Sequence, residues 1–419
     1  MYRKTTLDNG VRVVTEHIPY VRSVTLGFWF QTGSRDEDAD NNGISHFIEH
    51  MVFKGTKTCT AREIAEIIDA AGGQLNAFTG KEHTCFYVRV LDEHLRLGLQ
   101  VLSDMVKNSC FDECEMKKEK GVVIEEIRMY EDCSDEVVHD MLAGAVLAGH
   151  PLGRSILGTE EIISALDRDA VVNHMKKYYT AGNLVVAAAG NVTHEYVVEL
   201  ANELLGDMTG EATPFSQGAP SVKPRGQVRT KDTEQVHLCL GTLAVGRRSE
   251  QRYALYVLDA AFGGGMSSRL FQELREERGL VYATYSYHTL FQDIGLFSIY
   301  AGCGPNNVAH VIEFAQAECD RLVKYGFSDL ELHRAKEQLK GSLMLSLEST
   351  ANRMSRLAKS ELFDGVFLTP DELIARIDAV TREQVHAIAE EILGPDRRVT
   401  VAIGPIDPSS VGIDEAVEE

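Results

Sequence analysis

The chain has 419 residues, 44% of them hydrophobic and 25% charged, which is typical of a folded globular protein with two or three domains. Its 63 Asp and Glu residues outnumber its 42 Lys and Arg residues, and the formal net charge is -21 at pH 7. This balance argues against a nucleic-acid partner, because phosphate-binding surfaces need clustered Lys and Arg. The acidic excess either favours cationic partners or only maintains solubility.

The cysteines and the apolar segments bear on localisation. Eight cysteines are scattered along the chain without a Cys-x-x-Cys pair, which predicts reduced thiols in a cytoplasmic protein. The N-terminal residues lead directly into a strand-like pattern, so no secretory signal is expected. No run of about 18 apolar residues occurs, and no membrane span is expected.

The first half of the chain begins with strand patterns and continues mainly with helix patterns. Asn9-Gly10 predicts a hairpin turn between strands at 3–8 and 11–17, because both residues tolerate a positive φ. Thr60–Glu63 is a capping box that starts a helix ending at Gly72-Gly73. Further strands are expected at 24–30, 74–79, 84–90 and 184–190, and further helices at 92–108, 112–128, 134–148 and 160–178. This order predicts an α+β fold rather than a doubly wound parallel sheet.

The second half repeats the first. Residues 206–226 contain Gly and Pro without a periodic apolar pattern, which is typical of a linker. Beyond it, the segment that starts at Phe327 parallels the one at Phe111, and the segment at Val399 parallels the one at Val185. The offsets, 327 minus 111 and 399 minus 185, are 216 and 214, which indicates an internal duplication. We therefore predict two homologous domains, 1–205 and 227–419, each a mainly antiparallel β-sheet packed with helices.

One stretch of the first half carries chemistry. His46, Glu49 and His50 lie three and four residues apart, so a helix would project all three from one face. Two imidazoles at this spacing can hold a divalent metal, and a carboxylate beside the bound water can act as a general base. The same motif also arises by chance, and a His on an apolar helix is often a satisfied core residue. The corresponding segment of the second half, Leu258–Phe262, has no His or Glu, which favours a single site.

A catalytic zinc site needs a third protein ligand besides the two imidazoles. Glu119 and Glu126 lie seven residues apart on the helix predicted at 112–128, so they face the same way. Their spacing alone is also that of ordinary solvated helix carboxylates. The offset of 216 places Ser342 opposite Glu126 in the second half, so this carboxylate is likewise absent from the repeat.

The His-x-x-Glu-His order, with a carboxylate 76 residues further on (126 minus 50), resembles the inverzincin metallopeptidases. The close resemblance is to the family that contains the mitochondrial processing peptidase, pitrilysin and insulysin, and it covers nearly the whole chain. It implies a zinc metalloendopeptidase in which His46, His50 and Glu126 hold Zn²⁺. It also implies that Glu49 is the general base and that Glu119 orients a ligand.

The second half contains a further pair that matches this family. Arg275 and Tyr282 match the Arg and Tyr with which the family contacts the substrate and the transition state. By composition alone, Arg275 would be a surface ion-pair residue. The glycines at 263–265 are not followed by Gly-Lys-Ser/Thr, so a nucleotide-binding loop is not expected.

The resemblance also implies substrate contacts in the first half. Asn76, Ala77 and Phe78 resemble the family's exposed edge strand, which binds peptides by β-augmentation, although they could equally form a plain sheet strand. Glu136 and Asp140 fall where processing peptidases place acids that recognise an arginine near the cleavage site. They could equally be a mildly unfavourable like-charge pair on one helix face.

The resemblance implies a dimer. The chain has half the length of pitrilysin-like members, which enclose a chamber with four such domains, and it shows no targeting presequence. We therefore expect a bacterial-type homodimer in which Arg275 and Tyr282 act in trans, although some members form heterodimers. The expected activity is zinc-dependent hydrolysis of peptides or unfolded, basic segments inside a closed chamber. The alternative is a noncatalytic peptide-binding or structural subunit, a class that usually has an eroded zinc motif.

Overall fold

The computed structural model describes residues 2–215, 218 and 225–408, so residues 216–217 and 219–224 of the predicted linker lie outside the described residues. The chain divides into two compact units made of discontinuous segments. Unit 1 comprises Met1–Arg128, Arg154–Ser216 and Ser346–Phe367, and unit 2 comprises Met129–Gly153, Gln217–Leu345 and Leu368–Glu419. The sequence predicts two continuous domains, 1–205 and 227–419. These ranges describe the two halves of the chain and stay a prediction.

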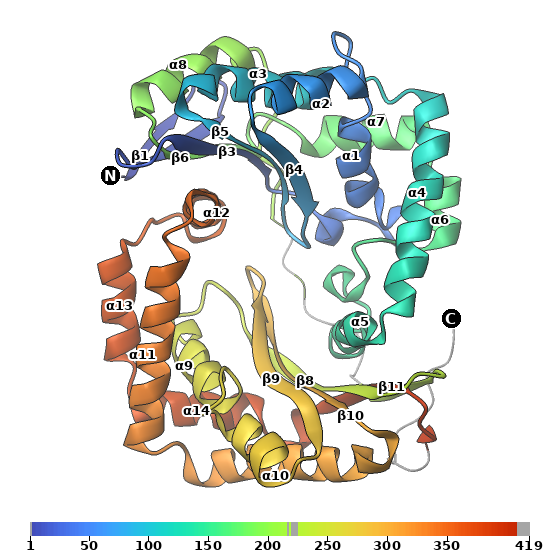
Figure 1. Ribbon diagram of the computed structural model, residues 1–419, viewed down its shortest axis with the longest axis vertical. Coiled ribbons are helices and arrows are strands. Elements are labelled where there is room, and N and C mark those ends of the chain that lie inside the picture. The colour runs from blue at the N-terminus through green and yellow to red at the C-terminus, as the bar shows by residue number, and fades with distance from the viewer. Residues whose placement is uncertain (1, 216–217, 219–224, 409–419) are drawn as a thin grey trace. The chain divides into compact units, whose positions relative to one another are not determined.

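Unit 1 is built on a six-stranded sheet of order β1-β2-β6-β3-β5-β4 (Figure 1). Only the pair of β2 and β6 is parallel; the other neighbours are antiparallel. The strands are β1 (Tyr2–Thr6), β2 (Arg12–His17), β3 (Ser23–Phe30), β4 (Gln74–Thr79), β5 (Thr84–Leu91) and β6 (Leu184–Gly190). The helices are α1 (Ile44–Val52), α2 (Ala61–Ala70), α3 (Leu95–Asn108), α4 (Glu113–Asp132), α6 (Glu160–Ala165), α7 (Arg168–Tyr178), α8 (His194–Leu205) and α12 (Thr350–Lys359), with the last turn of α4 entering unit 2.

Unit 2 repeats this topology in a five-stranded sheet of order β7-β11-β8-β10-β9, in which only β7 and β11 are parallel. The strands are β7 (Gln227–Thr230), β8 (Val236–Val245), β9 (Val281–Leu290), β10 (Ile294–Cys303) and β11 (Val399–Gly404). The helices are α5 (Ser134–Val146), α9 (Arg252–Phe262), α10 (Val308–Tyr325), α11 (Asp329–Ser346), α13 (Pro370–Ala379) and α14 (Arg382–Ile392). Five strands of each sheet share one order and one parallel pair, which confirms the duplication and the α+β class.

Strand β3 shows how the unit 1 sheet is covered on both faces. Val24, Leu26 and Phe28 face the main core, whereas Trp29 points to the opposite face and packs with α12. Successive side chains of a strand alternate between faces, so a strand covered on both sides is apolar throughout. Every residue from Val24 to Phe30 is buried, as that arrangement requires.

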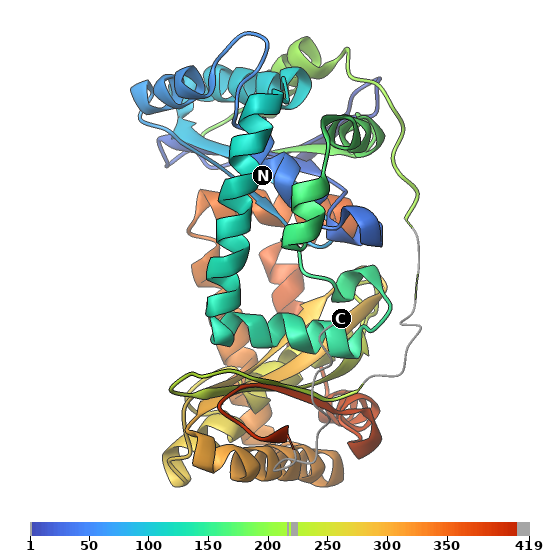
Figure 2. The same cartoon turned by 90° about the vertical axis from the view of Figure 1, so that its right-hand side faces the viewer.

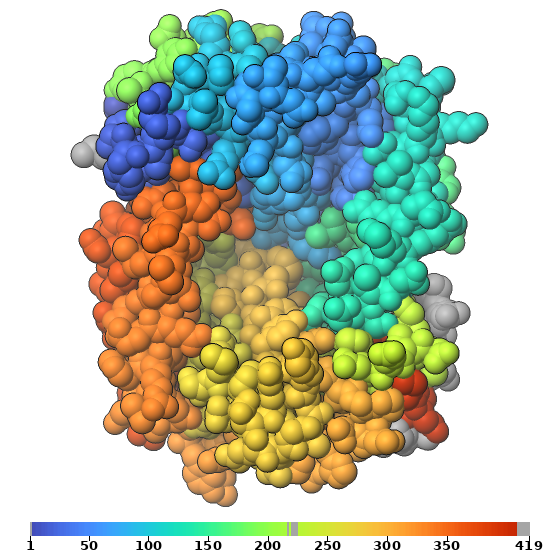
Figure 3. Space-filling model, viewed as in Figure 1, coloured from blue at the N-terminus to red at the C-terminus, as the bar shows by residue number. Residues whose placement is uncertain are grey.

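Helix α12 comes from the second half of the chain but packs on the sheet of unit 1. Trp29 Nε1 lies 3.0 Å from Met354 Sδ, and the hydroxyls of Thr25 and Thr350 lie 2.9 Å apart. Tyr2 and Phe367 stack at 4.2 Å between ring centroids. In Figure 3 the orange atoms of this segment meet the dark-blue atoms of the N-terminal segment. Buried apolar side chains such as Met354 each contribute about 1.5–3 kcal/mol, so α12 is an integral part of unit 1.

Helix α5 makes the reciprocal exchange: it comes from the first half but packs on the sheet of unit 2. Figure 2 shows α5 lying across β8 and β11. A Cβ added at Gly241 of β8 would lie 2.6 Å from Leu142 Cδ2, so a larger residue at this close approach would force the side chain of Leu142 to shift. Each half therefore supplies one helix to the other unit.

One expected helix is divided. The helix predicted at 160–178 is two helices, α6 and α7, because the chain turns at Leu166 and Asp167. The Asp167 carboxylate accepts a hydrogen bond of 2.7 Å from the backbone N–H of Ala170 and so begins α7 as its N-cap. Within the described ranges, no helix is both long enough and apolar enough to cross a bilayer.

Candidate metal centre

Helix α1 holds the His-x-x-Glu-His motif on the face that it does not bury in the core. Its apolar stripe, at positions i, i+3, i+4, i+7 and i+8, packs into the core of unit 1 and consists of Ile44, Phe47, Ile48, Met51 and Val52. The next stripe of the helix carries His46, Glu49 and His50, as the spacing predicts. Packing of the apolar stripe therefore fixes the direction in which the polar stripe points.

Helix α4 brings a carboxylate to these imidazoles from distant sequence. Glu126 Oε2 lies 3.3 Å from His50 Nε2, and Glu126 Oε1 lies 3.7 Å from His46 Nε2. A ligand atom from each of the three residues lies within 4.8 Å of the others, and no other such trio of potential ligands occurs among the described residues. Donors about 2.0–2.1 Å from a tetrahedral zinc stand roughly 3.4 Å apart, so this set fits zinc.

Glu119, two turns before Glu126 on α4, binds the far side of the second imidazole. His50 Nδ1 donates to Glu119 Oε1 at 2.8 Å, and Lys54 Nζ lies 2.6 Å from Glu119 Oε2. A carboxylate on Nδ1 fixes the tautomer whose Nε2 lone pair is free to bind a metal. Sequence reasoning missed Lys54, because its partner lies on another helix.

Glu49 stands beside the ligands but does not belong to the trio. Thr79 Oγ1, at the end of β4, donates to Glu49 Oε2 at 2.6 Å. Burial raises the pKa of Glu49, and the hydrogen bond from Thr79 opposes that rise without cancelling it. A buried carboxylate with a raised pKa is suited to accept and return a proton. Thr79 was expected in a strand, but no local pattern predicts its contact with Glu49.

Without a bound metal, the protein shifts the pKa values of the two imidazoles in opposite directions. Burial lowers the pKa of His46, and the charge of His50 lowers it further. Burial also opposes charge on His50, but the hydrogen bonds that His50 donates to Glu119 and Glu126 outweigh it and raise the pKa of His50 to about 9. The pKa of Glu126 is lowered, chiefly by its hydrogen bond with His50.

Arg275 and Tyr282 lie together in unit 2. Arg275 lies in the π-helical turn η5 (Phe271–Glu277), with its guanidinium carbon 5.1 Å from the ring centroid of Tyr282 and 4.8 Å from that of Phe271. Tyr282, at the start of β9, is 76% exposed. The structure thus brings the expected pair together and adds Phe271, which the sequence did not single out.

The remaining predicted site residues occupy two other places. Asn76, Ala77 and Phe78 lie in β4, an edge strand that pairs only with β5 in its sheet. Glu136 is exposed and Asp140 half-buried, one turn apart on α5 in unit 2. No contact with a substrate is present to test either set, and their roles stay predictions.

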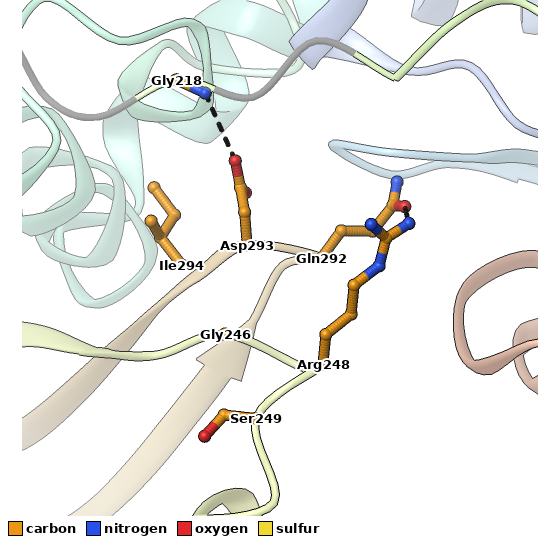
Figure 4. Close-up of a pocket in the computed structure, with 7 residues that line it drawn as sticks. All are labelled: Gly218, Gly246, Arg248, Ser249, Gln292, Asp293 and Ile294. Carbon is orange, nitrogen blue, oxygen red and sulfur yellow. Dashed lines mark hydrogen bonds between the residues drawn. The ribbon is translucent and has the colours of Figure 1, made fainter.

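A cavity of about 550 Å³ in unit 2 lies next to the turn between β9 and β10. Arg248 Nη2 donates to Gln292 Oε1 at 2.8 Å, and the backbone N–H of Gly218 donates to Asp293 Oδ2 at 3.3 Å (Figure 4). Its described lining contains neither His nor Cys. It therefore does not compete with the α1 cluster as a metal centre.

Comparison with known proteins places the chain in a family. "Insulinase (Peptidase family M16)" matches residues 12–160, and "Peptidase M16 inactive domain" matches residues 165–339. A Bacillus subtilis protein named an uncharacterized zinc protease is 46% identical over 409 residues, covering 98% of this chain and 99% of the relative. A Streptomyces coelicolor relative with the same kind of name is 44% identical, covering 96% of this chain and 90% of its own length.

Two solved structures share the fold. A protease from Helicobacter pylori superimposes with a TM-score of 0.88 at 22% identity, covering 97% of this chain and 99% of that one. A structure described as a peptidase M16 inactive domain, from Pseudomonas fluorescens, gives a TM-score of 0.90 at 21% identity, covering 97% of this chain and 98% of that one. The similarity in sequence confirms the resemblance drawn from the zinc motif: the chain belongs to peptidase family M16.

Proposed function

We propose that the chain is a zinc-dependent endopeptidase whose metal ligands are His46, His50 and Glu126. The observation that carries this proposal is the convergence of one ligand atom from each of these residues within 4.8 Å of the others. The names of the two relatives, which describe them as zinc proteases, agree with it. The "inactive domain" match begins at residue 165, beyond all three ligands, so it does not favour a noncatalytic subunit.

The residues of the chain divide the chemistry between them. Zinc in this site would lower the pKa of a bound water to about 7 and polarise a peptide carbonyl. Glu49 takes a proton from the water as the water oxygen attacks the carbonyl carbon, and then delivers that proton to the leaving nitrogen as the C–N bond breaks. Glu119 and Lys54 hold His50 in its ligating tautomer throughout.

The proposed substrates are peptides or unfolded, basic segments. Glu136 and Asp140 on α5 supply acidic groups, and the net charge of -21 would attract cationic chains. The edge strand β4 would add a peptide strand through Asn76, Ala77 and Phe78. All eight cysteines are free, which supports a reducing, cytoplasmic location.

We further propose that two chains form a homodimer that closes the chamber, with Arg275 and Tyr282 serving the zinc site of the partner chain. The contacts of Arg275 with the rings of Phe271 and Tyr282 place a cationic group on unit 2. Mixing Glu49→Gln chains with Arg275→Ala chains should restore part of the activity, because one of the two sites in each mixed dimer would be complete. Verified mixed dimers that remain inactive would contradict the action in trans.

The mechanism is tested by Glu49→Gln. A peptide-library digest first identifies a cleaved peptide. The variant should keep about one zinc per chain and lose roughly 10²–10⁴-fold in cleavage rate, because Gln cannot accept the proton. Glu115→Gln, on the same helix as Glu126 and paired with Lys118, is the matched control and should cleave normally. Undiminished cleavage by Glu49→Gln would refute its role, and native protein with far less than one zinc would favour a noncatalytic subunit.

A further inference from the structure

The two imidazoles on α1 are held in different ways. The ring of His50 is tied to Glu119, which in turn contacts Lys54. His46 Nδ1 is buried and has no hydrogen-bond partner among the described residues. Metal-binding imidazoles normally donate this second nitrogen to an outer acceptor that fixes the ring. The direction of His46 Nε2 therefore depends on the backbone of the helix turn that carries it.

That turn is held by a buried carboxylate from outside the helix. Glu37 Oε1 accepts from the backbone N–H of Ser45 at 2.9 Å, and Glu37 Oε2 accepts from the backbone N–H of Gly43 at 2.8 Å. The side chain of Asn42 donates to the same Oε2 at 2.9 Å. Glu37 is only 3% exposed. Each of its two oxygens accepts a hydrogen bond from a backbone N–H at the start of α1. Ser45 immediately precedes His46, and the anchor thus lies one residue from the ligand.

The surrounding chain fixes Glu37 itself. Arg154 Nη1 donates to the backbone carbonyl of Glu37 at 2.9 Å, and Asn42 Nδ2 also donates to Ser155 O at 3.0 Å. Gly43 has a φ of +93°, and a Cβ there would lie 2.6 Å from Leu157 O. The entry to α1 is therefore enclosed by the segment that follows Gly153 and has little freedom to shift.

We propose that Glu37 is a positioning residue for His46: it fixes the first turn of α1 and thereby aims His46 Nε2 at the metal. Glu37 fixes the direction of His46 through the backbone, whereas Glu119 fixes the direction of His50 through a hydrogen bond to its ring. A carboxylate is suited to this task, because its two oxygens accept from successive orphan N–H groups at a helix start, where negative charge is also favoured. The inference rests on the proposed ligand set, which the experiment tests separately.

The test is Glu37→Gln, which keeps the shape but turns an NH₂ group towards one of the two backbone donors. We expect zinc binding about 10-fold weaker in competition with a chromophoric chelator, as for other outer partners of metal ligands. The visible spectrum of the cobalt(II)-substituted protein should change as well, because it reports ligand geometry. The matched control is Glu63→Gln: Glu63 caps α2, a helix without proposed ligands, and its loss should change neither readout.

A purely structural role for Glu37 gives a different result. Glu37→Gln would then unfold at a lower temperature but bind zinc with the affinity and the cobalt spectrum of the unaltered chain, and the proposal would be wrong. If Glu37→Gln does not fold, Asn42→Ala removes only one donor and should still weaken zinc binding; an unchanged affinity would overturn the proposal. His46→Ala separates the two hypotheses: if it retains full zinc affinity, the ligand set itself is wrong.

Discussion

The two units share a strand order but differ in what their corresponding helices carry. In unit 1, α1 and α4 supply His46, His50 and Glu126, whose ligand atoms face one another. In unit 2 the corresponding helices are α9 and α11, and the offset of 216 places Ser342 where α4 has Glu126 (126 plus 216). The repeated fold of unit 2 therefore forms without these metal ligands.

Helix α9 of unit 2 carries a polar cluster in which both oxygens of the carboxylate accept hydrogen bonds. Asp259 on α9 accepts from Ser286 Oγ at 2.5 Å through Oδ1 and from His288 Nδ1 at 2.6 Å through Oδ2. Both carboxylate oxygens are therefore used in joining α9 to β9. In unit 1, by contrast, the oxygens of Glu126 face two imidazole nitrogens across a gap that suits a metal. The difference indicates that the ligands serve function, because the fold does not need them.

The largest expected effect comes from making α4 resemble α11. Glu126→Ser should reduce the zinc content after dialysis from about one per chain to near zero and abolish cleavage, because two imidazoles alone hold zinc weakly. Elemental analysis of the dialysed protein measures this. Ser342→Ala in unit 2 is the control and should change neither property. Full zinc content in Glu126→Ser would remove this residue from the ligand set.

A smaller effect is expected at the outer carboxylate. The offset of 216 places Ala335 opposite Glu119 (119 plus 216), so Glu119→Ala copies unit 2 at this position. We expect zinc binding 10–100-fold weaker, because His50 would lose the acceptor that fixes its tautomer. Chelator competition measures the affinity. Glu115→Ala, which removes an ion pair with Lys118 on the same helix, should not alter it, and equal affinities in both variants would argue against a role for Glu119.

The contrast between the halves was predictable where it depends on local pattern. The helix that carries His46 and the strand at 74–79 follow from local pattern, and the duplication follows from two offsets. The division at Leu166 also had a local signal, since Asp167 is a favourable N-cap, but the apolar pattern continues across it. Local sequence patterns therefore predict whether a segment is a helix or a strand better than they predict where that segment begins and ends.

The rest depends on contacts between distant segments. The exchange of α5 and α12 leaves no trace in their periodicity, because each helix would show the same apolar stripe whichever sheet it covered. Glu37 lies in a polar loop, and its value at the start of α1 appears only when the chain folds back on itself. Lys54 and Thr79 are recognisable only through Glu119 and Glu49, which they contact.

A pH effect is expected at the general base. Thr79→Val removes the hydrogen bond that favours the charged form of Glu49, so the pKa of Glu49, already raised by burial, should rise further. Glu49 must be deprotonated to act, and the acid limb of the kcat/KM profile should therefore move to higher pH. Thr79→Ser retains the hydroxyl and should keep the original profile. An acid limb that stays in place in Thr79→Val would show that another group controls it.

The smallest effect concerns the zinc-free protein. The folded state raises the pKa of His50 from 6.5 to about 9, so its charged form is favoured by folding. This contribution to stability is fully present below pH 6.5 and is lost as the pH rises through about 9. The urea midpoint of the zinc-free chain should therefore fall over that interval, and His50→Gln should flatten the dependence. Zinc must displace the proton of His50 before it can bind this imidazole. Added zinc should consequently restore stability most at high pH, and a zinc effect that is equal at pH 6.5 and pH 9 would contradict the protonated pair.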